Sequence, residues 1–283
     1  MPSRGARALG YRRRMSGWNP LRRQAAPSTR WSTLDQVRGV AVLWMTAYHF
    51  AFDLNHFGWI RQNFLGDPVW TVQRTLIVSL FLGCAGFGQA IALSQGLGWS
   101  RFWRRWAQVA GCALLVTAGS WWMFPRSFIY FGVLHAVAVM LPLLRLLRLL
   151  ALRQPRAAVM AGLGALAVAA PWAAAWTHAQ WPALAVLDER AWNWIGWIGR
   201  KPVTEDYVPL LPWIGVMLWG WALGRWWSAR GASGTRPANA VPAAVGGAAP
   251  GALAWIGRYS LSWYMLHQPV LIGLLMLAGR PSP

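Results

Sequence analysis

Residues 69–93 read VWTVQRTLIVSLFLGCAGFGQAIAL, and this stretch decides the class of fold. It contains one charged residue, Arg74, and exceeds the roughly 20 residues that a transmembrane helix needs. Six further apolar segments of similar length lie near 39–57, 104–123, 127–147, 157–176, 206–226 and 254–276. The sequence therefore predicts an all-α, polytopic transmembrane helical bundle with about seven spans.

The composition points to the same lipid environment. Hydrophobic residues make up 56% of the 283 residues and charged residues 12%, whereas ordinary globular domains are about 25% charged. A soluble domain of this size could not bury so much apolar surface in one core. The 23 tryptophans fit a membrane protein, since their amphipathic rings favour the interface. Cys84 and Cys112 fall inside apolar spans, which favours small core residues over a disulfide or metal ligands.

The distribution of charge predicts the orientation. With the N-terminus in the cytoplasm, 20 of the 27 basic residues lie on the cytoplasmic side and six on the other. Such an asymmetry over short loops is what the positive-inside rule predicts. We expect a multi-pass protein of the bacterial inner membrane, with a cytoplasmic N-terminus and a periplasmic C-terminus. Orientation then accounts for the net charge of +20, and no nucleic-acid partner is expected.

The chain divides into a tail and one membrane domain. Residues 1–36 contain eight arginines and no apolar stretch, which predicts a basic, disordered cytoplasmic tail before a transmembrane domain over 37–278. The outer loop 177–205 holds four tryptophans and is expected to lie in the interface or to cover a polar cavity. Residues 229–251 are rich in Gly, Ala and Pro, as flexible linkers are. Small residues in the second span predict close helix packing: Gly83, Gly86 and Gly88.

The first span carries four ionisable side chains, Arg38, His49, Asp53 and His56. At about 100° per residue they project within about 60° of one another, on one stripe of the helix. An ionisable residue in a span costs about 2.5–3.5 kcal/mol and usually has a partner and a purpose. His49 and Asp53 are four residues apart, so a carboxylate–imidazole contact suited to general-base catalysis is expected. The alternative is a structural hydrogen bond between packed helices.

Two more histidines lie within predicted spans. His135 follows Phe131 inside the fourth span, and His267 lies midway along the seventh. Each alone is compatible with an interhelical hydrogen bond. Together with His49 they place three imidazoles at similar depth on three helices, which favours a shared site. No pair has the spacing of a helical zinc site, so no metal is expected.

Two further charged residues each have two possible roles. Arg74, five residues into the second span, either snorkels outward or pairs with Asp53. Asp206 begins the sixth span, with Pro209 in its first turn, and either caps that helix or binds a substrate.

Four segments, taken in order, resemble one family. They are residues 34–41 (LDQVRGVA) with 48–54 (YHFAFDL), then 131–135 (FGVLH), 206–213 (DYVPLLPW) and 257–269, which ends in LHQP. The pattern is similar to that of the heparan-alpha-glucosaminide N-acetyltransferase catalytic-domain family, within the wider group of integral-membrane acyltransferases. The family's best-known catalytic histidine falls in the loop after the first helix. This chain has only His56 there, at a different offset.

The resemblance implies transfer of an acyl group, expected to be acetyl, from cytosolic acyl-CoA to a sugar or glycan acceptor across the membrane. It implies that Arg38 binds CoA at the cytoplasmic mouth. His49 then deprotonates the acceptor or carries the acyl group, and Asp53 orients it. The remaining candidates for binding substrate are Arg74, His135, His267, His56 and Asp206.

A second class of function also fits buried histidines. A proton-coupled transporter or flippase of a lipid-linked sugar would use them as a relay. Its usual sign, a pair of inverted repeats with broken helices, is not evident in the sequence. Consumption of acyl-CoA would separate the two classes. Membrane lipid is a partner in both, and the sequence does not fix the oligomeric state.

Overall fold

The computed structural model describes residues 31–150, 156–232 and 251–279. Most of the predicted tail 1–36 and of the predicted linker 229–251 lies outside the described residues. The described elements are helices, which follow one another along the chain as α1 (Ser32–His56), α2 (Pro68–Ser94), α3 (Trp99–Met123), α4 (Val133–Leu150), α5 (Ala157–Gln180), η1 (Pro182–Asp188), η2 (Asn193–Ile195), α6 (Leu210–Ala232), α7 (Ala252–Arg258) and α8 (Ser260–Ala278).

The all-α class is confirmed for the described part of the chain. Each of the seven predicted segments overlaps a long helix, and the last also includes the short helix α7, which ends one residue before Tyr259. Among the described residues, α2, α5 and α8 are long and apolar enough to cross a membrane. The count of seven spans and the orientation of the termini stay predictions.

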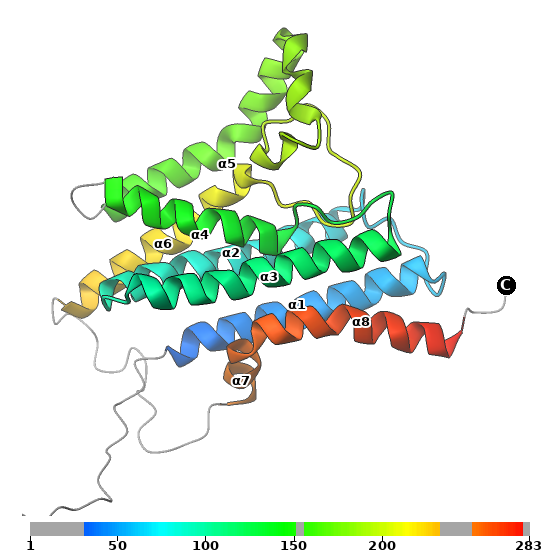
Figure 1. The fold of residues 1–283 in the computed structure, drawn as a ribbon, viewed down its shortest axis with the longest axis horizontal. Coiled ribbons are helices and arrows are strands. Elements are labelled where there is room, and N and C mark those ends of the chain that lie inside the picture. The colour runs from blue at the N-terminus through cyan, green and yellow to red at the C-terminus, as the bar shows by residue number, and fades with distance from the viewer. Residues whose placement is uncertain (1–30, 151–155, 233–250, 280–283) are drawn as a thin grey trace, which may run out of the picture. The chain divides into compact units, whose positions relative to one another are not determined.

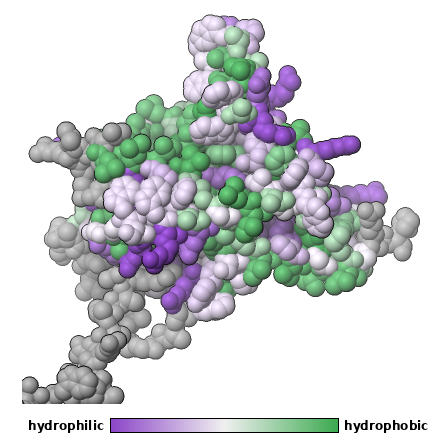
Figure 2. All heavy atoms as spheres, in the orientation of Figure 1, coloured by the Kyte–Doolittle hydropathy of each residue, from purple (hydrophilic) through white to green (hydrophobic). Residues whose placement is uncertain are grey.

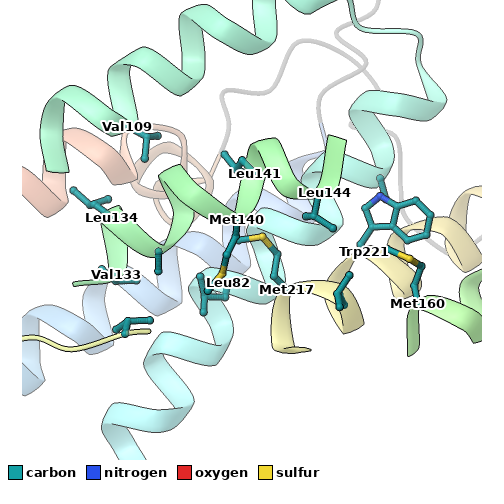
Figure 3. Packing of buried hydrophobic residues seen from close by; sticks show 14 of the residues in the cluster. Leu82, Val109, Val133, Leu134, Met140, Leu141, Leu144, Met160, Met217 and Trp221 are labelled. Atoms are coloured by element: carbon teal, nitrogen blue, oxygen red, sulfur yellow. The ribbon is translucent and has the colours of Figure 1, made fainter. Parts of the chain in front are cut away.

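Glycines bring α2 and α6 into close contact. A Cβ atom at Gly86 would overlap the Met217 carbonyl, and one at Gly220 would overlap the Gly83 carbonyl. The prediction that small residues of the second span serve close packing is thus confirmed at Gly86. Leu82, Met140 and Met217 fill the adjoining core from three helices (Figure 3).

The helix α1 packs against α2, α7 and α8. At its first turns, α7 comes so close that a Cβ at Gly257 would overlap the Asp35 carbonyl. Farther along, α8 runs beside α1 (Figure 1). This arrangement places the helix that carries His267 against the helix that carries His49.

Large apolar side chains are exposed over much of the described surface. Trp122 is 86% exposed, Trp172 72% and Leu166 71%, and hydrophobic atoms spread over the face drawn in Figure 2. In water such a surface would be an aggregation hazard, while in a bilayer it faces lipid tails. Together with the apolar helices, it marks a membrane protein.

The segment between α5 and α6 is folded onto the connection between α3 and α4. The Val208 amide donates to the Phe131 carbonyl at 3.0 Å, and the Glu205 amide donates to the Ser127 carbonyl at 2.8 Å. The buried side chain of Asn193 accepts a hydrogen bond from the Tyr130 hydroxyl at 3.1 Å. These bonds hold the loop 177–205 and the residues after it against the connection between α3 and α4. The sequence predicted where this loop lies but not these hydrogen bonds.

Candidate functional site

Two histidines from neighbouring helices meet inside the bundle. The ring centroids of His49 on α1 and His267 on α8 are 5.1 Å apart. The rings of Tyr48 and Tyr264 lie against them, with centroids 5.8 Å from His49 and 5.7 Å from His267 respectively. Aromatic side chains thus border the pair, and the predicted convergence of His49 and His267 is present.

The hydrogen bonds of His267 fix its tautomer. Its Nδ1 lies 2.7 Å from the Tyr264 carbonyl oxygen, which can only accept, so Nδ1 carries the proton. In the neutral ring Nε2 is then an acceptor, and it is buried without a partner among the described residues. The Nδ1 atom of His49 is likewise buried and without a partner there.

A carboxylate and an amide complete the group. The Gln268 side chain donates from Nε2 to Oδ1 of Asp53 at 3.0 Å. The expected contact of Asp53 with His49 is not formed, and the carboxylate is bound instead by Gln268 on the facing helix. Within the described part of the chain, Oδ2 of Asp53 and Oε1 of Gln268 are buried and unpaired. Sequence reasoning gave Gln268 no role, although its place directly after His267 was an available signal.

These four unpaired atoms of His49, Asp53, His267 and Gln268 will be called the α1–α8 acceptor cluster. An unpaired buried polar group costs about 1–3 kcal/mol, so a native fold keeps several together only where something else binds them. Three of the four, the two oxygens and His267 Nε2, accept hydrogen bonds if Asp53 is ionised. The cluster therefore suits a ligand that brings hydroxyl or amine donors.

Arg38 lies at the opposite end of α1 from His56 and already has partners. Its guanidinium donates to Oδ1 of Asp35 at 3.3 Å and, at the limit of 3.5 Å, to the Cys84 carbonyl of α2. Gly88 leaves the space in which the guanidinium lies, since a Cβ there would approach it to 2.9 Å. Arg38 and His49 are eleven residues apart, about 16 Å along a helix.

His135 forms hydrogen bonds with residues that do not belong to the acceptor cluster. Its Nδ1 accepts from the Gly132 amide at 3.2 Å, so Nε2 carries the proton and donates to the Thr117 hydroxyl at 2.9 Å. That hydroxyl donates to the Ile129 carbonyl at 2.9 Å. Both ring nitrogens are thus used within α3, α4 and their connection. No hydrogen bond or ring contact among the described residues joins His135 to His49 or His267, and we interpret it as structural.

His56 is the last residue of α1, and Asp206 lies in the segment before α6. Asp206 precedes α6, but its Oδ2 accepts from the Val133 amide at 2.9 Å, so it caps α4 and not the helix that follows it. His56 is exposed at the end of α1, with its ring near Phe57 and Phe124. Neither contacts the acceptor cluster through a bond that involves the described residues.

Arg74 lies on an inward face of α2. Positions 70, 74, 77 and 81 share one side of a helix, and Trp70, Ile77 and Phe81 all pack in the cluster around Tyr48. The ion pair with Asp53, one of the two alternatives that the sequence left open for Arg74, is not formed. No hydrogen bond or ion pair within 4.0 Å joins Arg74 to another described residue. The described residues also contain no group of three or more His, Cys, Asp or Glu that could hold a metal ion.

The chain matches the family described as heparan-alpha-glucosaminide N-acetyltransferase, catalytic, over residues 30–269. It belongs to this family. No curated protein and no solved structure matches it.

The family match extends from just before α1 to Pro269 in α8, so it includes all four residues of the acceptor cluster. Membership points to a membrane protein with transferase activity, in a family that in general uses acetyl-CoA as its donor. The resemblance noted from four short segments is thereby confirmed.

Proposed function

We propose that the protein is an integral-membrane acyltransferase that moves an acyl group, in the first instance acetyl, from cytosolic acyl-CoA to a sugar or glycan acceptor. The acceptor is bound from the outer side of a bacterial inner membrane. The catalytic unit is the domain 37–278, with about seven spans, a cytoplasmic N-terminus and a periplasmic C-terminus. The 20 to 6 division of basic residues supports this orientation.

The observation that carries the proposal is the α1–α8 acceptor cluster. A sugar brings several hydroxyl or amine donors, which are the groups that these unpaired atoms lack. Two of the cluster's members are histidines, the residue that most often acts as a general base. Family membership supplies the reaction class that joins such a base to a thioester.

In the proposed reaction His49 acts as the base. Its imidazole takes the proton from the acceptor O–H or N–H while the freed lone pair attacks the thioester carbonyl carbon. The C–S bond then breaks, and the CoA sulfur leaves with the proton that the imidazole returns. Enclosure among helices limits competing hydrolysis. A covalent acyl-histidine on His49 is the alternative path to the same products.

The other members of the cluster position the acceptor. His267 offers Nε2 to a donor on the acceptor, because the Tyr264 carbonyl holds its Nδ1 proton. Asp53 fixes the Gln268 amide through one oxygen and leaves the other for the acceptor. In this arrangement Asp53 acts beside His49 and not by direct orientation of its ring. His56, His135 and Asp206 are not used.

Arg38 is proposed to bind a phosphate or the pantetheine carbonyl of CoA at the cytoplasmic end. Since Arg38 is paired with Asp35, donor binding must compete with that ion pair or share the guanidinium with it. Asp35→Asn would remove this ion pair and is expected to tighten donor binding. Arg38→Gln is expected to weaken it without loss of the base.

The test is acetyl-CoA binding and turnover by the protein in nanodiscs. The wild type should bind and consume acetyl-CoA in the presence of an amino sugar, while His49→Leu should bind it without turnover. The proposal would be contradicted if the wild type bound acetyl-CoA but formed no acetylated product. In that case transport of a lipid-linked sugar, the second class of function, becomes the hypothesis to test in proteoliposomes.

A further inference from the structure

The first turns of α3 separate basic from aromatic side chains. Residues 99–106 read WSRFWRRW. At about 100° per residue, Arg101, Arg104 and Arg105 share one side of the helix, whereas Trp99 and Trp103 project from the opposite side. All three arginines are exposed. These three side chains will be called the arginine face of α3.

This part of α3 is held against α4, which runs beside it (Figure 1). The Arg145 guanidinium of α4 lies 5.0 Å from the ring centroid of Trp99 and 4.4 Å from that of Phe102. The Trp106 indole donates to the Ala138 carbonyl at 2.7 Å. The aromatic side of these turns therefore faces α4, and the arginine face points away from it.

The neighbouring helices supply no carboxylate to the arginine face. No hydrogen bond or ion pair within 4.0 Å joins Arg101 or Arg104 to another described residue, and Arg105 donates to Gln108 on the same side at 3.1 Å. The helix packs against α4 and also contacts α8, and none of α3, α4 and α8 contains Asp or Glu. An anion in contact with Arg101 and Arg104 therefore has to come from another molecule.

The arginine face lies at the level of lipid headgroups and continues into an apolar surface. Trp99 and Trp103 are 43% and 45% exposed, and such amphipathic rings favour the membrane interface. On the side of the arginines, Leu115 is 64% exposed and lies eleven residues, about 16 Å, beyond Arg104. Between them Gly111 leaves open space, since no atom lies within 4 Å of a Cβ placed there. One side of α3 thus offers positive charge and then apolar surface.

We propose that the arginine face of α3 binds the phosphate of an anionic phospholipid, whose acyl chain lies along the side of Gly111 and Leu115. Guanidinium groups bind phosphate oxygens in pairs, and they stay charged at every physiological pH. A lipid fits better than a soluble anion, because charge and apolar surface follow one another along the same helix. By the predicted orientation the lipid belongs to the cytoplasmic leaflet, which is rich in anionic headgroups. The inference goes beyond acetyl transfer, since it concerns neither the donor nor the acceptor.

The experiment compares binding of phosphatidylglycerol and of phosphatidylcholine to the protein in detergent micelles, with native mass spectrometry to count bound lipids. The wild type should bind phosphatidylglycerol about 10- to 100-fold more tightly, since each arginine near an anionic headgroup contributes about fivefold. The double variant Arg101→Gln, Arg104→Gln should lose most of this preference. The matched double variant Arg156→Gln, Arg258→Gln removes two exposed arginines from the start of α5 and from α7, and should keep it.

Equal binding of the two lipids by the wild type would overturn the site. An equal loss in both double variants would also overturn it, because the preference would then depend on net charge alone. Release of phosphatidylglycerol by an equal concentration of glycerol 3-phosphate would assign the arginines to soluble phosphates, and release by acetyl-CoA would assign them to the donor. Either release contradicts a lipid site. A failure of the proposed acetyl transfer would leave all these results unchanged, since none of them involves turnover.

Discussion

Two groups of buried polar side chains occur in this molecule, and they differ in how completely they are paired. Around His135 and Asn193, ring nitrogens, hydroxyls and the amide find partners within the fold. Around His49 and His267, four buried atoms have none among the described residues. The first group stabilises the connection of α4 and the loop 177–205. The second costs stability unless a ligand or ordered water pairs with those atoms.

The largest expected effect comes from replacing one histidine of each group by leucine. His49→Leu should lower acetyl transfer by about 10²- to 10⁴-fold, the usual contribution of a general base. The same change should leave the unfolding temperature unchanged or raised, because it removes an unpaired polar group. Steady-state kinetics and thermal unfolding of the same nanodisc sample measure both.

His135→Leu is the matched variant from the paired group. It should destabilise the protein, since Thr117 and the Gly132 amide lose their partner. The folded fraction should keep its turnover. A catalytic loss for His135→Leu equal to that of His49→Leu would contradict the division into two groups.

Gln268→Leu tests whether the amide holds Asp53 in place. Loss of a hydrogen bond to a charged group is worth about 1.5–3 kcal/mol, so turnover should fall about 10- to 100-fold. Donor binding should not change, because the amide is remote in sequence from Arg38 and unconnected to it by any described bond. Gln36→Leu, at an exposed position of α1, serves as the control. Wild-type kinetics for Gln268→Leu would remove Asp53 and Gln268 from the mechanism.

Asn193→Ala tests how much the hydrogen bonds of the paired group contribute to the stability of the protein. The change leaves the Tyr130 hydroxyl and the Asp188 carbonyl without their partner, which should lower the free energy of unfolding by about 1–3 kcal/mol. Chemical denaturation of the solubilised protein measures the loss. Asn63→Ala, on an exposed turn, should cost less. An unchanged midpoint for Asn193→Ala would mean that complete pairing contributes nothing here.

The long helices and the inward stripe of α1 could be predicted from the sequence, because both depend on local periodicity. Apolar runs place α2 and α5, and a spacing near 3.6 residues puts Arg38, His49 and Asp53 on one side. The exposure of His56 could not be predicted in this way, since α1 ends at that residue.

Partnerships across helices could not be predicted, because they depend on which helices become neighbours. Asp53 is close to His49 along the chain, but α8 brings Gln268 to its carboxylate. Asp206 is the expected cap of the helix that follows it, whereas pairing of Tyr207 with Phe131 carries it to the start of α4. Sequence rules favour partners that are close along the chain, whereas at both carboxylates tertiary packing supplies a partner from a distant segment.

The most direct test of the central claim is a cryo-EM structure of the protein with a non-hydrolysable thioether analogue of acetyl-CoA. We predict that the CoA phosphates lie toward Arg38 and that the acyl carbonyl lies at the α1–α8 acceptor cluster. An acceptor atom positioned between that carbonyl and His49 should then fall within the roughly 3–3.5 Å of a reactive complex. An acyl group bound beside His135, or outside the bundle, would contradict the assignment of His49 and His267.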